Sequence, residues 1–124
     1  PGLISGASKG VGLGLQFLRH LSRTRIILQM VDVYNKTTEE IIDEIEDLLN
    51  ELKEFDADLS RRVRWLVLNK IDLISEEDRE FITDQLIDYF GSETNIYSIS
   101  AMQTKGTKEL MIDVGRHLEK LDEE

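Results

Sequence analysis

The run Asn69-Lys70-Ile71-Asp72 has the residue types best suited to specific chemistry, and it directly follows the apolar stretch 63–68. An aspartate carboxylate in such a turn can accept two hydrogen bonds from a guanine ring, from N1–H and from the exocyclic amine. Adenine offers no such pair of donors, and a site built on these bonds can reject the wrong base by roughly 10⁴-fold. The methylenes of Lys70 could cover the flat ring. Taken alone, the same run is equally compatible with an ordinary polar turn.

A second candidate segment, Ser100-Ala101, follows the apolar stretch 95–99. A backbone N–H at this position could donate a hydrogen bond to the O6 atom of guanine. Taken alone, a small polar turn after a strand would be the better interpretation. Its position relative to Asn69–Asp72 is what gives the segment weight.

The elements that must position these residues alternate along the chain. Apolar, β-branched runs over 26–33, 63–68 and 95–99 predict buried strands. Helical spacing of apolar residues and capping signals predict helices over residues 13–22, 37–55, 75–90 and from 107 onward. This order predicts an α/β fold with a parallel sheet and helices on both faces.

Ligands of such sheets bind beyond the carboxyl ends of the strands. Asp32, the Asn69–Asp72 turn and Ser100-Ala101 each lie at the end of a predicted strand. We therefore expect these three segments to meet at one edge of the sheet and to form one binding site. Asp32 is expected to be a hydrogen-bonding residue there.

The composition excludes several classes of function. The chain has 124 residues, 40% hydrophobic content and a formal net charge of −10, which fits one acidic domain and argues against binding nucleic acid through bulk charge. It contains no cysteine, so disulfides and thiolate chemistry are excluded. The two histidines, His20 and His117, have no ligand-like spacing, and we assign no metal ligand and no catalytic residue.

The glycine-rich segment Ser5–Gly12 admits a second interpretation, because it resembles the phosphate-binding loop of short-chain dehydrogenases. Asp32 would then be the acid that binds the ribose. Only four residues precede this loop, and no Tyr-x-x-x-Lys occurs, since Thr38, Glu93 and Ala101 stand four residues after the three tyrosines. Both observations make a fragment of an NAD(P)-binding dehydrogenase the weaker hypothesis.

Taken together, the motifs resemble those of the Obg/CgtA family of bacterial GTPases. NKxD after one strand and SA after the next match the base-recognition motifs of GTPases, and Pro1-Gly2 resembles the end of the DxPG motif. The segments GLISGASKGVGLG and VRWLVLNKIDL also resemble this family, and the likeness extends from Pro1 to the last predicted helix.

The resemblance implies a P-loop NTPase (Ras-like) fold, built as a three-layer sandwich. It also implies binding of GTP and GDP, Mg²⁺ in the intact protein, slow hydrolysis of GTP to GDP and phosphate, a cytoplasmic location and a role in assembly of the large ribosomal subunit. Residues 1–14 would form the second switch. The residues that the resemblance assigns to the nucleotide are Pro1, Gly2, Asn69, Lys70, Ile71, Asp72, Ser100, Ala101 and Met102.

The sequence also departs from the family pattern. The phosphate-binding motif G-x-x-x-x-G-K-[ST], the threonine of the first switch and the aspartate of DxPG do not occur in these 124 residues. We therefore expect the chain to be the C-terminal part of a GTPase domain and to be inactive alone. The strand at 26–33 should have an unprotected edge through which the chain could self-associate. A non-catalytic interaction domain with the same fold is the alternative.

Overall fold

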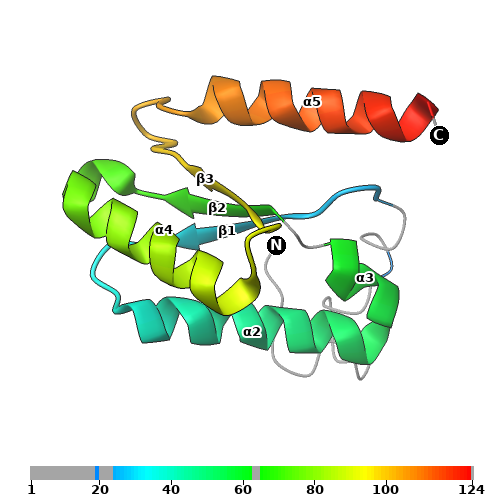
Figure 1. The fold of residues 1–124 in the computed structure, drawn as a ribbon, viewed down its shortest axis with the longest axis horizontal. Coiled ribbons are helices and arrows are strands. Elements are labelled where there is room, and N and C mark those ends of the chain that lie inside the picture. The colour runs from blue at the N-terminus through cyan, green and yellow to red at the C-terminus, as the bar shows by residue number, and fades with distance from the viewer. Residues whose placement is uncertain (1–18, 20–23, 63–64, 124) are drawn as a thin grey trace.

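The computed structural model describes residues 19, 24–62 and 65–123 (Figure 1). Within these residues, three parallel strands form one sheet in the order β1-β2-β3. The strands are β1 (Leu28–Asp32), β2 (Trp65–Asn69) and β3 (Asn95–Ser98). All three predicted strand positions are thus confirmed. The predicted helix at 13–22 and the glycine-rich segment 1–14 lie outside the described residues, except for Arg19.

The described residues also form the α-helices α2 (Thr38–Phe55), α3 (Ala57–Arg62), α4 (Glu76–Phe90) and α5 (Thr107–Glu123). The short helix α3 is an addition to the sequence-based expectation. Asp56 ends α2 with an extended backbone, and its side chain accepts a hydrogen bond from the backbone N–H of Asp58 at 3.0 Å, which begins the new helix.

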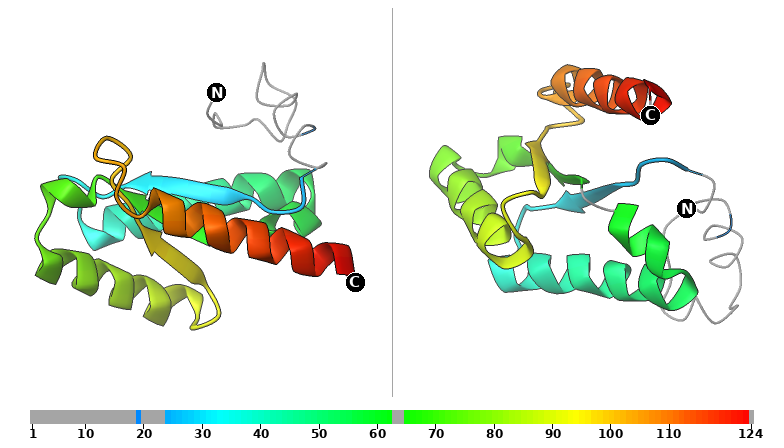
Figure 2. Two further views of the ribbon diagram at one scale, coloured as in Figure 1. Left: turned by 90° about the horizontal axis from the view of Figure 1, so that it is seen from above. Right: turned by 45° about the vertical axis from the view of Figure 1, so that its right-hand side comes forward.

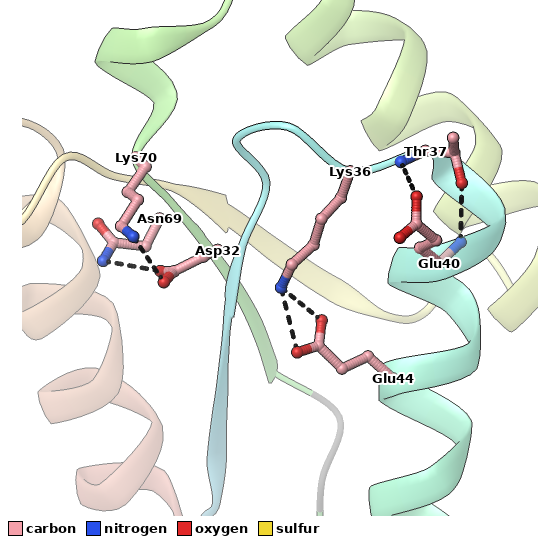
Figure 3. Close-up of polar contacts among 7 residues, drawn as sticks. All are labelled: Asp32, Lys36, Thr37, Glu40, Glu44, Asn69 and Lys70. Atoms are coloured by element: carbon pink, nitrogen blue, oxygen red, sulfur yellow. Dashed lines mark hydrogen bonds and ion pairs between the residues drawn. The ribbon is translucent and has the colours of Figure 1, made fainter.

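The beginning of α2 is fixed by a capping box. The Thr37 hydroxyl accepts from the Glu40 backbone N–H at 3.1 Å, and the Glu40 carboxylate accepts from the Thr37 backbone N–H at 3.0 Å (Figure 3). This backbone hydrogen bond is the main cause of a lowered pKa for the Glu40 carboxyl. The Ser75 hydroxyl caps α4 in a similar way, and Gly91 ends that helix with φ of +107°.

The sheet separates two apolar layers (Figures 1 and 2). We call the face covered by α2 and α4 the α2 side and the opposite face the α5 side. The core of the α2 side is aliphatic and comprises Val31, Val33, Ile41, Ile45, Leu66, Leu68, Ile82 and Leu86. Alternating residues of the strands point to opposite faces, so residues of the same strands supply the other layer. Its buried members are Trp65, Val67, Ile99, Leu110 and Val114.

Aromatic contacts hold the α5 side together. The rings of Trp65 and Tyr97 stack with centroids 5.2 Å apart, and His117 of α5 meets Trp65 edge-on at 5.6 Å. The Tyr97 hydroxyl donates to the Asp113 carboxylate at 2.7 Å. Burial, followed by this hydrogen bond, raises the pKa of Tyr97 to about 12. These contacts link β3 to α5, so both faces of the sheet are covered.

The predicted α/β architecture, with a parallel sheet and helices on both faces, is therefore confirmed. Among the described residues, β1 pairs only with β2, which leaves its outer edge without a partner strand. Self-association through this edge remains a prediction. None of the helices in the described ranges is long and apolar enough to cross a membrane.

Candidate functional site

The carboxyl ends of the three strands meet at one edge of the sheet, as the sequence predicted. Asp32 and Asn69 are partners in the register of β1 and β2, and the backbone N–H of Val33 donates to the Asn69 carbonyl at 3.2 Å. On the other side of β2, the N–H of Ile99 donates to the Leu68 carbonyl at 2.8 Å. The ends of β1 and β3 are thus both hydrogen-bonded to the last residues of β2.

The turn after β2 has a defined backbone conformation. Lys70 has φ of +69°, in the left-handed region that non-glycine residues rarely occupy, and residues Ile71–Leu73 form a short 3₁₀ turn. The N–H of Leu73 donates to the Lys70 carbonyl at 3.0 Å, and the N–H of Ile71 donates to the Ile99 carbonyl at 3.3 Å. The turn is therefore closed on itself and attached to the end of β3. A left-handed residue in such a position is often part of a functional site.

Polar side chains connect the three strand ends, and Figure 3 shows the contacts between the ends of β1 and β2. The Lys70 ammonium lies 3.0 Å from the Asp32 carboxylate, and the Asn69 side-chain N–H donates to the same carboxylate over 3.4 Å. The Asn69 side-chain oxygen accepts a hydrogen bond from the backbone N–H of Ala101 at 3.0 Å. Asn69 therefore bridges the loop after β3 and the end of β1.

Asp72 differs from these neighbours. It is half-buried, and its carboxylate has no hydrogen bond or ion pair to any of the described residues. No donor among the described residues therefore competes with a ligand for the two carboxylate oxygens. That lack of competition is what recognition of a guanine edge would require.

The loop after β3 is closed at its base. Ser100 is buried, and its backbone N–H and carbonyl form a pair of 3.0 Å hydrogen bonds with Lys105. The Ser100 hydroxyl also accepts from the Gln103 N–H at 3.2 Å. At the tip of the loop, Met102 is 92% exposed. The chain then enters α5 through Gly106, which has φ of +75°.

This geometry changes what can be expected of the backbone donors in the loop. The N–H groups of Ser100 and Ala101 already have partners, Lys105 and the Asn69 side chain. A guanine O6 could bind the Ala101 N–H only by displacing the Asn69 oxygen. Met102 has no hydrogen-bond partner for its N–H among the described residues, so this group is a second possible donor.

Sequence reasoning brought the correct segments together but missed their contacts. The pairing of Asp32 with Lys70, the Asn69–Ala101 bridge and the Ser100–Lys105 closure were not predicted. The first of these had a usable signal, because an acid at the end of one strand and a lysine after the next lie side by side in a parallel sheet. The other two depend on the conformations of the loops.

The remaining predicted site residues, Pro1 and Gly2, lie outside the described residues, as does the switch segment assigned to residues 1–14. In the part of the chain that the structure describes, no three His, Cys, Asp or Glu side chains are grouped to hold a metal ion. No protein-family model matches the chain.

Proposed function

We propose that this chain supplies the guanine-recognition half of an Obg-type GTPase domain with the P-loop NTPase fold. In this proposal Asp72 accepts hydrogen bonds from N1–H and the exocyclic amine of guanine, and the Lys70 stem covers one face of the base. Ser100, Ala101 and Met102 supply the loop beside O6. The observation that carries the proposal is the half-buried Asp72 carboxylate, which has no partner among the described residues and lies in a turn attached to two other strand ends.

Two further features support the proposal. The parallel sheet with helices on both faces is the architecture that the resemblance implies, and the NKxD and SA segments lie at neighbouring strand ends. The backbone of the turn is held by its own hydrogen bonds, at the Lys70 carbonyl and at the Ile71 N–H. A preformed site loses less conformational entropy on binding than one that must be ordered.

The sequence contains no G-x-x-x-x-G-K-[ST] motif, which binds phosphates in P-loop NTPases. Hydrolysis of GTP to GDP and phosphate, with Mg²⁺, is therefore proposed for a protein that contains a phosphate-binding loop in addition to these residues. A role in assembly of the large ribosomal subunit is proposed on the family resemblance alone. The chain itself is proposed to bind the guanine base and to leave GTP intact.

The test is an NMR titration of the chain with GMP, AMP and XMP, which differ at the base. We expect a preference for GMP in the wild-type chain and a loss of GMP affinity of roughly 10- to 150-fold in Asp72→Asn, from the value of hydrogen bonds to a charged group. Xanthine carries a carbonyl in place of the guanine amine, and an asparagine can donate to it. The same variant should therefore gain affinity for XMP.

Asp88→Asn is the matched control, because Asp88 is exposed on α4 and has no partner among the described residues. It should bind all three nucleotides as the wild type does. Equal binding of GMP and AMP by the wild-type chain would contradict the proposal. So would an Asp72→Asn variant whose base preference is unchanged.

A further inference from the structure

We propose that Asp32 is a positioning residue for base binding, which holds Lys70 and Asn69 in place and thereby sets the affinity for guanine without setting the choice of base. This inference rests on the proposed function. It concerns a residue on a different strand from the recognition motifs. The observation behind it is the network in which one Asp32 carboxylate contacts both side chains that precede Asp72 (Figure 3).

Each oxygen of the Asp32 carboxylate contacts a different side chain. Oδ2 lies 3.0 Å from the Lys70 ammonium, and Oδ1 accepts from the Asn69 side-chain N–H at 3.4 Å. Because the Asn69 side-chain nitrogen faces Asp32, its oxygen faces the loop after β3. There it accepts a hydrogen bond from the Ala101 N–H at 3.0 Å. Asp32 thus acts on the β2 turn directly and on the β3 loop through Asn69.

This carboxylate is poorly suited to a purely stabilising role. The side chains of Lys70 and Asp32 are 48% and 44% exposed, and exposed ion pairs of this kind contribute little to folding. The negative charge of Asp32 restricts the long side chain of Lys70 through the ion pair. A lysine that must lie along a base would lose rotamer freedom on binding, and an ion pair formed beforehand reduces that loss.

The same contacts argue against a ribose-binding role for Asp32. A ribose-binding acid needs carboxylate oxygens that are free to accept from hydroxyl groups, whereas both oxygens of Asp32 are engaged by protein donors. The carboxylate that has no partner among the described residues of this site is Asp72. The two acids therefore have different proposed roles. Asp72 binds the base, and Asp32 positions Lys70 and Asn69.

The experiment is a double-mutant cycle on the 124-residue chain, measured by NMR titration with GMP and AMP. Asp32→Asn keeps the shape of the side chain and an acceptor for Asn69 but removes the charge that faces Lys70. We expect it to lower GMP affinity by about 3- to 10-fold, the effect of one additional long side chain to immobilise, with an unchanged GMP-to-AMP ratio. In a Lys70→Met background the same substitution should have no effect, and Asp32→Glu should restore part of the affinity.

A result that overturns the inference is an Asp32→Asn variant with wild-type GMP affinity, or with the same loss in both backgrounds. A changed base ratio would also overturn it, because it would make Asp32 a recognition residue. If the wild-type chain shows no preference for GMP, the proposed function fails. The positioning of Lys70 and Asn69 by Asp32 is then tested by NMR without nucleotide. Asp32→Ala should then shift the Ala101 amide resonance and increase the mobility of the Lys70 side chain, and the absence of both changes would refute it.

Discussion

The two sides of the sheet are built differently, although the same strands supply both. On the α2 side, residues such as Ile41 and Leu86 are completely buried in an aliphatic layer under two helices. On the α5 side, one described helix covers a layer dominated by Trp65. There Met30 of β1 is 57% exposed, and Met111 of α5 is 58% exposed. On β1, Val31 of the α2 side is therefore buried, whereas Met30 of the α5 side is largely exposed.

The difference in burial indicates how each side stabilises the edge of the sheet where the strands end and the candidate site lies. At fully buried positions of the α2 side, such as Leu86, a lost methyl group leaves a cavity that its neighbours fill only in part. The α5 side is attached through a smaller number of specific contacts and can relax toward its uncovered part. Substitutions on the α2 side should therefore affect overall stability, whereas those near the α5 connection should also affect the loop at residues 100–105.

The largest expected effect comes from matched leucines on the two sides. Leu86→Ala, at a position with no exposed surface, should lower the free energy of unfolding by about 4 kcal/mol. Leu110→Ala on α5 should cost about 2 kcal/mol, because the cavity it leaves can partly collapse. Urea denaturation of both variants measures the difference. Equal losses would show that the two sides are equally well packed.

The connection into α5 gives an intermediate effect. Gly106→Ala should lower the free energy of unfolding by about 2 kcal/mol, because a left-handed alanine is strained and its Cβ would lie 2.5 Å from the Ser98 carbonyl oxygen. Gly115→Ala is the matched control inside α5, where a Cβ would have nothing within 4 Å. It should stabilise the chain by about 0.5–1 kcal/mol through helix propensity. Thermal unfolding of both variants measures these changes. A change in melting temperature with the same sign in both variants would contradict the prediction.

The smallest expected effect tests the polar contact between β3 and α5. Tyr97→Phe keeps the ring stacked on Trp65 but removes the hydroxyl that donates to Asp113, and it should cost about 1 kcal/mol at neutral pH. The pKa of Tyr97 is raised from 10.0 to about 12 in the folded chain, so the contribution of this group is complete below pH 10 and is lost as the pH rises toward 12.

The free energy of unfolding of the wild type should therefore fall more steeply between pH 10 and pH 12 than that of Tyr97→Phe. Urea denaturation across this range provides the measurement. Tyr34→Phe serves as the control, because Tyr34 is exposed and has no partner among the described residues. Parallel curves for the wild type and Tyr97→Phe would mean that the hydroxyl contributes nothing to holding α5.

Much of the fold follows from local patterns in the sequence. The apolar run that became β2 is buried at four successive positions, and a strand covered on both faces has this continuous pattern. The Thr37 and Ser75 caps were visible as short polar signals before an apolar repeat. Helix α3 was missed because its six residues, ADLSRR, contain one buried position, Leu59, and so carry no helical repeat.

The meeting of the three candidate segments could be predicted from the sequence, whereas their side-chain and loop contacts could not. Parallel topology alone requires Asp32, Asn69 and Ser100 to lie near one edge, whatever their side chains do. The engagement of the Ala101 N–H by Asn69 depends on a side-chain rotamer and on the closure of the loop by Lys105, which no periodic pattern encodes. The left-handed conformation of Lys70 was equally hidden, because lysine carries no preference for it.

The closed base of the loop after β3 makes its tip a convenient place for a reporter group. The chain contains no cysteine, so a thiol introduced at Met102 would be its only one and could be labelled with a single dye. The 92% exposed side chain there leaves room for the label, and the paired hydrogen bonds between Ser100 and Lys105 would keep the attachment point fixed. Fluorescence from this position would follow events at the sheet edge in real time.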